Sequence, residues 1–164
     1  MLAPEQMAIV EKHQDSWPVN VEKIARELGI SVYDVSSWPE KVSGMIKKDE
    51  EDGGESGYAI YVNENHPSVR QRFTIAHEIG HFLLHEHLIG EGLVEDVLWR
   101  AGGLSNRVET EANRMAARIL MPSGLIKEAY GQKIRSIKTL AKEFEVSEDA
   151  MSIRILGVPY RKII

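Results

Sequence analysis

The feature that most constrains the fold is a pair of histidines, His77 and His81, set four residues apart in an apolar stretch. On an α-helix this spacing gives about 40° of rotation and about 6 Å of rise, so both imidazoles point the same way. Their neighbours are apolar, namely Ile79, Phe82, Leu83 and Leu84. We therefore expect a long, largely buried helix over residues 67–87 that begins at Pro67. Imidazoles buried on this helix need polar partners.

Glu78 turns this pair into a candidate metal site. Two neutral imidazoles at that separation can hold one zinc ion, and Glu78 would lie beside the ion rather than on it. Its carboxylate could take a proton from a water whose pKa the metal lowers, which is the chemistry of the H-E-x-x-H motif. The alternative is a solvated His/Glu face on an amphipathic helix, and the apolar neighbours count against it. We predict His77 and His81 as metal ligands and Glu78 as the catalytic base.

Two further histidines, His85 and His87, lie about 12 and 15 Å along the helix axis from His77. His87 has the spacing of the third ligand in the metzincin pattern, but that pattern requires a glycine where this chain has Leu84. Because leucine lets the helix continue, we interpret His85 and His87 as surface residues or as residues that support the ligands from outside.

A catalytic zinc site needs a third protein ligand, and the best candidates are Glu109 and Glu111, on a helix expected over residues 107–121. On a helical projection Glu109 lies about 65° from the centre of the apolar face, and Glu111 about 95° on the other side. Glu109 also shares its side with the small Ala116, which allows a second helix to approach closely. Geometry therefore favours Glu109, although both glutamates could instead be N-terminal charges that the helix dipole stabilises.

The remaining segments indicate an α+β fold. Apolar periodicity and capping residues predict two N-terminal helices, three strands and a long surface loop. The expected ranges are 4–13 and 21–28 for the helices, 30–35, 42–47 and 58–62 for the strands, and 88–106 for the loop. The second and third strands should form a hairpin around the acidic, glycine-rich residues 49–57.

The last part of the chain is expected to hold two helices, capped by Ser136 and Ser147, that resemble a helix-turn-helix. We therefore divide the chain into a metal-binding domain at 1–122 and a helical segment at 123–164 packed on it. This segment leaves a second class of function open, a DNA-binding or protein-binding regulator with a structural or vestigial metal site. Acidic residues count against DNA binding because phosphates would repel them. They crowd the turn and the start of the second helix: Glu143, Glu145, Glu148 and Asp149.

Composition narrows the cellular setting. The chain has no cysteine, so neither a disulfide nor a thiolate ligand can form. The formal net charge is -5, which gives no general attraction to nucleic acid, so we expect a protein partner rather than DNA or RNA. The N-terminal residues do not read as a signal peptide, and no apolar run is long enough for a membrane span. We expect a cytoplasmic protein.

Two long motifs, occurring in order, resemble the ImmA/IrrE family of metallopeptidases. The matching stretches are Gly57 to Asn63, Arg70 to His85 and Glu109 to Pro122. The family pattern runs R-x-R-F-T-x-A-H-E-x-G-H-x-x-L-H and then E-x-E-A-N-x-F-A-x-x-L-L-M-P. This chain departs from it with Met115 in place of Phe and Ile119 in place of Leu, and both exchanges conserve volume.

The resemblance implies a zincin-like core, in which a small sheet lies beside the metal helix. It implies Zn²⁺ as the cofactor, Glu109 as the third ligand and Glu78 as the base. It also implies a metalloendopeptidase with an anti-repressor role, because several family members cut a cognate helix-turn-helix repressor of a phage, a mobile element or a stress response. The sequence does not identify the oxyanion donor: Tyr58 and Tyr61 are candidates, but buried strand tyrosines are more often packing residues. The strand at 57–63 could offer an edge for an extended substrate segment to pair with.

Overall fold

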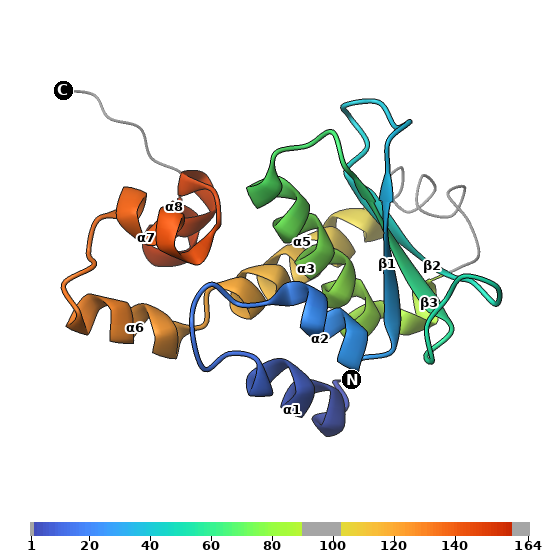
Figure 1. Cartoon of the computed structure of the whole chain (residues 1–164), viewed down its shortest axis with the longest axis horizontal. Helices are drawn as coiled ribbons and strands as arrows, with labels where there is room; N and C mark the ends of the chain where they lie inside the picture. The colour runs from blue at the N-terminus through green and yellow to red at the C-terminus, as the bar shows by residue number, and fades with distance from the viewer. Residues whose placement is uncertain (1, 90–102, 159–164) are drawn as a thin grey trace.

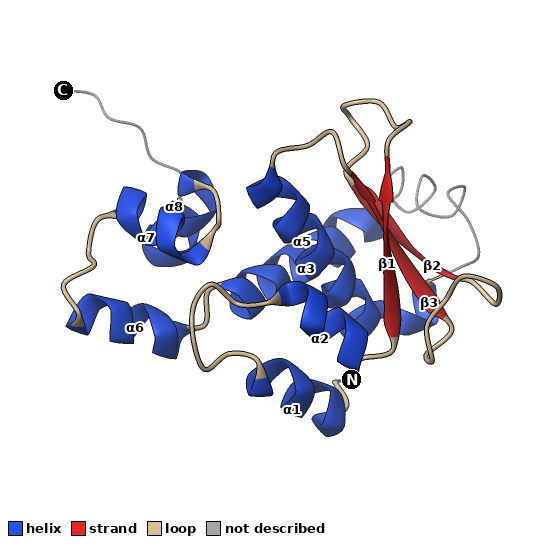
Figure 2. Cartoon of the chain, in the orientation of Figure 1, coloured by secondary structure: helices blue, strands red, loops and turns tan. Residues whose placement is uncertain are grey.

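The computed structural model describes residues 2–89 and 103–158, which form a mixed α and β structure (Figures 1 and 2). A small sheet lies at one end, the C-terminal helices lie at the other, and the two longest helices run between them. The N-terminal half contains α1 (Pro4–Lys12), α2 (Val21–Glu27), β1 (Ile30–Val35), β2 (Gly44–Lys48), β3 (Tyr58–Asn63), α3 (Ser68–His85) and the 3-10 turn η1 (Glu86–Leu88). The second half contains α5 (Gly103–Leu120), α6 (Ser123–Gly131), α7 (Ile137–Phe144) and α8 (Glu148–Leu156).

The three strands are ordered β1–β3–β2. β1 runs parallel to β3 with Ile30 beside Tyr58, and β2 runs antiparallel to β3 with Gly44 beside Val62. The predicted hairpin of β2 and β3 is confirmed, although β2 begins two residues later than expected. Because β3 is paired on both sides, the expectation that it offers a free edge is wrong. In the described part of the chain the outer strands are β1 and β2.

The helix that carries the motif, α3, packs in the middle of the molecule, against the sheet, α2 and above all α5. Gly80 explains how α5 can lie so close. A Cβ atom on Gly80 would lie 2.9 Å from the carbonyl oxygen of Ala112 on α5. Since such a contact is shorter than van der Waals packing allows, a glycine is needed where the two helices cross.

The C-terminal part contains three helices, so the prediction of two was incomplete. α6 was missed because it has no side-chain cap and buries only Leu125 and Ala129, which give a weak apolar period. The two predicted caps are confirmed. The side chains of Ser136 and Ser147 accept hydrogen bonds from the backbone N–H groups of their own first turns.

Arg72 on α3 joins the C-terminal helices to the rest of the molecule. Its guanidinium donates to the backbone carbonyl oxygens of Val19, Phe144 and Glu145. The ring of Trp17 stacks on that of Phe144 with 5.5 Å between centroids. These contacts hold α3, the segment before α2 and the end of α7 together.

Two helix boundaries differ from those expected. α3 ends at His85 and tightens into η1, instead of continuing as an α-helix to residue 87. α5 begins at Gly103, so residues 103–106 are helical although they were expected to be loop. The rest of the expected loop, 90–102, lies outside the described residues. No described helix is long and apolar enough to cross a membrane.

Candidate metal centre

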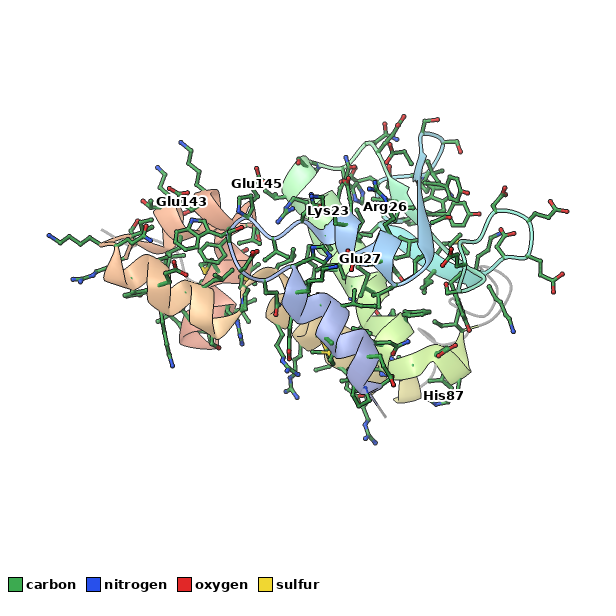
Figure 3. The ribbon with its side chains drawn as sticks, turned by 60° about the horizontal axis from the view of Figure 1, so that its bottom comes forward. Lys23, Arg26, Glu27, His87, Glu143 and Glu145 are labelled. Carbon is green, nitrogen blue, oxygen red and sulfur yellow. The ribbon has the colours of Figure 1, made fainter. Side chains whose placement is uncertain are left out.

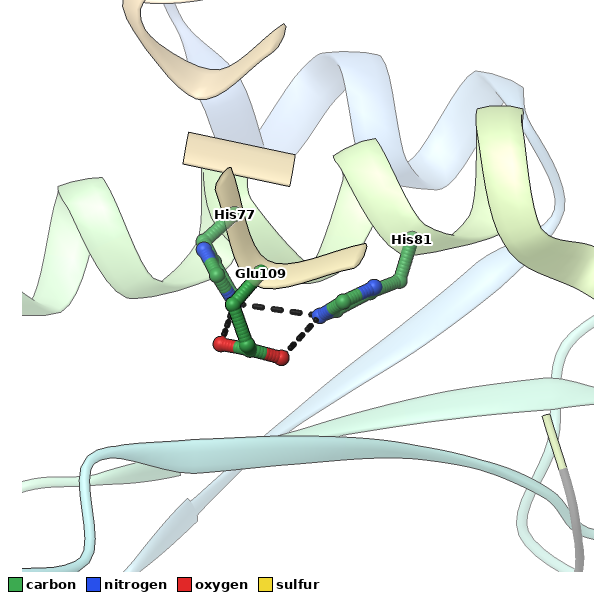
Figure 4. A group of neighbouring side chains, drawn as sticks. All are labelled: His77, His81 and Glu109. Carbon is green, nitrogen blue, oxygen red and sulfur yellow. Dashed lines mark hydrogen bonds and ion pairs between the residues drawn. The ribbon is translucent and has the colours of Figure 1, made fainter. Parts of the chain in front are cut away.

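Three polar side chains converge where α3 meets α5 (Figure 4). The Nε2 atoms of His77 and His81 lie 3.1 Å apart. One carboxylate oxygen of Glu109 lies 3.1 Å from Nε2 of His77, and the other lies 3.0 Å from Nε2 of His81. Because the histidines are one turn apart, they share the face of α3 that meets α5. The structure thus brings together the three residues that the sequence singled out as ligands.

The spacing of these atoms suits one metal ion. One ligand atom from each residue lies within 4.8 Å of the others. Three donors bound to a tetrahedral zinc ion at about 2.0–2.1 Å would lie about 3.3 Å apart. The observed separations of 3.0–3.1 Å are slightly shorter, so a small opening would admit the ion. Two imidazole nitrogens and one carboxylate also form the donor set of known peptidase zinc sites.

Burial and hydrogen bonding compete in setting the charges of the three groups. Burial alone would raise the pKa of Glu109, but hydrogen bonds from His77 and His81 outweigh it and hold this pKa well below its usual range. Burial lowers the pKa of His81, and the carboxylate of Glu109 only partly offsets it. Burial would also lower the pKa of His77, but the carboxylates of Glu109 and Glu78 outweigh burial and raise this pKa. Glu109 is therefore ionised and His81 neutral, the forms that bind a metal.

Each of the two histidines is also held from behind. Nδ1 of His77 lies 2.7 Å from Oδ1 of Asn113, and Nδ1 of His81 lies 3.1 Å from Nδ1 of His85. When each Nδ1–H donates to these acceptors, both Nε2 lone pairs point at the centre. The outer hydrogen bonds thus select the tautomer that ligation requires.

The support behind His81 extends further. Nε2 of His85 lies 3.1 Å from one carboxylate oxygen of Glu111, whose other oxygen accepts from Arg107 at 2.8 Å. His85 is only 4% exposed, so its interpretation as a surface residue is wrong and that of an outer support fits. His87 is exposed, as expected, and lies at the lower edge of the molecule in Figure 3. Arg107 was not singled out from the sequence, although its four-residue offset from Glu111 was a usable signal.

Glu78 lies next to this centre in a cleft of about 260 Å³. His77, Glu109 and Asn113 line the same cleft, and Glu78 itself is 4% exposed. Gly44, the first residue of β2, also lines it. The outer strand β2 therefore borders the cleft, rather than the central strand β3.

The two tyrosines considered as oxyanion donors contact other groups. The hydroxyl of Tyr58 donates to Glu86 at 3.4 Å, and that of Tyr61 donates to Asp49 at 3.1 Å. Neither tyrosine is among the described residues that line the cleft. The structure therefore brings neither candidate to the site.

Comparison with known proteins shows where this arrangement belongs. Residues 25–156 match the peptidase family described as the IrrE N-terminal-like domain, a range that includes both motifs and the whole centre. The chain belongs to the ImmA/IrrE family. Family membership accounts for the order of the two motifs along the chain.

Individual relatives match over part of their length. The radiation response metalloproteases IrrE of Deinococcus radiodurans and Deinococcus deserti are 40% identical over 93 residues and 36% identical over 95 residues. These segments cover 54% and 55% of this chain, but only 27% and 33% of the relatives. A Mycobacterium tuberculosis transcriptional regulator has a similar fold, with a TM-score of 0.60 and 16% identity over 99% of this chain and 49% of that one.

Proposed function

We propose that this chain is a zinc-dependent endopeptidase whose ion is held by His77, His81 and Glu109. The observation that carries the proposal is the convergence of their three donor atoms within 4.8 Å, beside the cleft that contains Glu78. Membership of a peptidase family and the relatives named metalloprotease support it. The small sheet beside α3 supports a zincin-like core.

Glu78 is the proposed catalytic base. Zinc bound at the centre would lower the pKa of a water molecule and polarise the carbonyl of the scissile bond. Glu78 lies in the cleft but outside the trio of ligands, so it can take the proton of the attacking water and pass it to the leaving amine. Asn113 and His85 keep the two imidazoles oriented while these protons move.

The strand β2 is the proposed edge along which the substrate lies. It is an outer strand of the sheet, and its first residue, Gly44, lines the cleft. An extended segment that pairs with such an edge is held through its backbone, which brings its peptide bonds to the site whatever their side chains. To select one substrate sequence over another, the protein therefore needs further contacts with substrate side chains.

We propose that the target is a specific cytoplasmic protein, a cognate helix-turn-helix repressor. The curated relatives are named for a radiation response, which supports a regulatory role rather than general degradation. The absence of cysteine fits a reducing compartment. A peptidase in the cytoplasm must also be narrow in its choice, and the C-terminal helices offer a surface for docking a folded partner.

A DNA-binding role for α7 and α8 is not favoured. Exposed carboxylates occupy the end of α7, the turn and the start of α8: Glu143, Glu145, Glu148 and Asp149. Figure 3 shows Glu143 and Glu145 at the surface of this region. A DNA backbone placed there would meet like charges. We propose that the segment at 123–164, which contains this helix-turn-helix-like pair, packs on the peptidase domain at 1–122.

The test compares the wild type with Glu78→Gln. Each is co-expressed with the regulator encoded beside this chain's gene, and the regulator is followed by mass spectrometry. Discrete fragments should appear with the wild type alone. An intact regulator with both proteins, under conditions that induce the response, would exclude this target while leaving the metal centre in place. Fragments with both would remove Glu78 from the mechanism.

A further inference from the structure

A second hollow continues from the cleft along α3 toward α8. This groove encloses about 620 Å³ and shares Arg70, Phe73 and Asn113 with the cleft. Its walls come from the first half of α3, from α5 and from α8, which lie near one another in Figure 1. Because the two hollows share residues, a polypeptide that crosses the metal centre can run on into the groove.

The surface of the groove is largely apolar. It includes Val69, Phe73, Ala117, Ala150 and Ile153. Ile153 is 49% exposed, so this large apolar side chain is only half covered by the protein itself. Concave apolar surface next to a catalytic site is where enzymes bind substrate side chains. The groove thus has the shape and the chemistry for a large apolar side chain.

Helix geometry gives the distance between the groove and the site of cleavage. Phe73 lies four residues before His77, and Val69 lies eight residues before it, so their axial offsets are about 6 and 12 Å. An extended peptide advances about 3.3 Å per residue. The groove is therefore reached about two to four residues away from the bond at the metal centre.

We propose that this groove is the specificity pocket, which binds a large apolar side chain of the substrate (Leu, Met or Phe) two to four residues from the cleaved bond. The inference rests on the proposed function, since it takes the cleft as the place of cleavage. Pairing with β2 holds the backbone, and the groove supplies the selection that backbone pairing lacks. The occupant is a segment of the substrate protein, because the groove shares Arg70, Phe73 and Asn113 with the cleft.

Two residues of α8 provide a matched pair for the test. Ile153 and Leu156 are 49% and 56% exposed, but only Ile153 lines the groove. Peptides from a digested bacterial proteome are incubated with zinc-loaded wild type, Ile153→Glu, Leu156→Glu and Glu78→Gln, and the cuts are mapped by mass spectrometry. In the wild type and Leu156→Glu we expect large apolar residues to be enriched two to four residues from the cut. Ile153→Glu should lose this enrichment and cut the same peptides at least about 10-fold more slowly.

A binding measurement that needs no hydrolysis separates the two proposals. Three proteins are immobilised: Glu78→Gln, and two double variants that also carry Ile153→Glu or Leu156→Glu. Each is offered the same peptides. Retention of peptides with large apolar residues should be lost with Ile153→Glu only. Equal retention in all three proteins, or an unchanged cleavage profile in Ile153→Glu, overturns the groove and leaves the peptidase standing. Groove-dependent retention without any cleavage by the wild type supports the groove, and the peptidase is then judged by the co-expression test alone.

Discussion

The metal centre and the groove lie along the same helix, yet their side chains are engaged in opposite ways. At the centre His77, His81 and Glu109 are mostly covered and contact one another, and both imidazoles are held from behind as well. In the groove Ile153 is half exposed beside other apolar side chains. The centre is thus organised by contacts within the protein, whereas the groove is completed only when a partner fills it.

This difference separates chemistry from recognition. A substitution at the centre removes a contact on which the reaction itself depends, so it should act on every peptide alike. A substitution in the groove removes surface that only some peptides use, so it should change which peptides are cut.

The largest effect is expected from the ligands. His81→Ala or Glu109→Ala should lower the zinc content from about one ion per chain to less than about a tenth, because a catalytic site needs three protein donors. Metal analysis of the purified proteins measures this directly. The matched control is His87→Ala, which changes an exposed histidine on η1 and should keep the metal. Zinc retained in both ligand variants would place the site elsewhere.

The next largest effect separates catalysis from metal binding. Glu78→Gln should keep the zinc content and the fold but slow hydrolysis about 10²- to 10⁴-fold, because an amide nitrogen cannot accept the proton of water. The rate on any peptide that the wild type cuts is the measurement, with zinc content determined on the same sample. A rate within tenfold of the wild type would show that another group acts as the base.

The two regions also differ in how far the sequence could predict them. His77 and His81 belong to one helix, so their common direction follows from local geometry alone. Placing Glu109 needed only the rotation of a second helix about its axis, which the apolar face supplies. The groove depends on α8 packing near α3, more than seventy residues away in sequence, and no local pattern reports that.

The sheet shows the same limit. A hairpin signal predicts that β2 and β3 are neighbours, and they are. It does not reveal that β1 pairs with the other side of β3, which makes β3 central and leaves β2 as the strand beside the cleft. Long-range pairing of this kind depends on burial in the whole molecule rather than on any single segment.

A smaller effect is expected behind the ligands. His85→Ala and Glu111→Ala should each weaken zinc affinity about 10- to 100-fold, because His81 then loses the acceptor chain that orients it. Competition with a chelating dye measures the affinity, and Glu111→Gln, which keeps one oxygen acceptor, should retain part of it. Unchanged affinity in His85→Ala would show that packing alone orients His81.

The smallest effect concerns the far wall of the groove. Ser147 caps α8 by accepting a hydrogen bond from the backbone N–H of Ala150 at 3.0 Å. Its loss in Ser147→Ala should cost about 1 kcal/mol of stability, which for a chain of this size lowers Tm by about 2–4 °C. Ser147→Asn keeps an acceptor at the cap and should melt like the wild type. Zinc affinity should not change in either variant, because the cap contacts none of the ligands.

The last prediction concerns whether the metal centre and the groove unfold in one thermal transition or in two. Arg72 joins α7 to α3, and the stack of Trp17 on Phe144 joins α7 to the segment before α2. The metal centre and the groove should therefore unfold together in spite of their different roles. Circular dichroism and tryptophan fluorescence should then give one coincident transition in the wild type, shifted as a whole in Ser147→Ala. Two separate transitions, with only the first shifted by the substitution, would show that the C-terminal helices fold as a unit of their own. The groove would then be a boundary between two units that can move apart, and its apolar wall could not hold a side chain at a fixed distance from the metal centre.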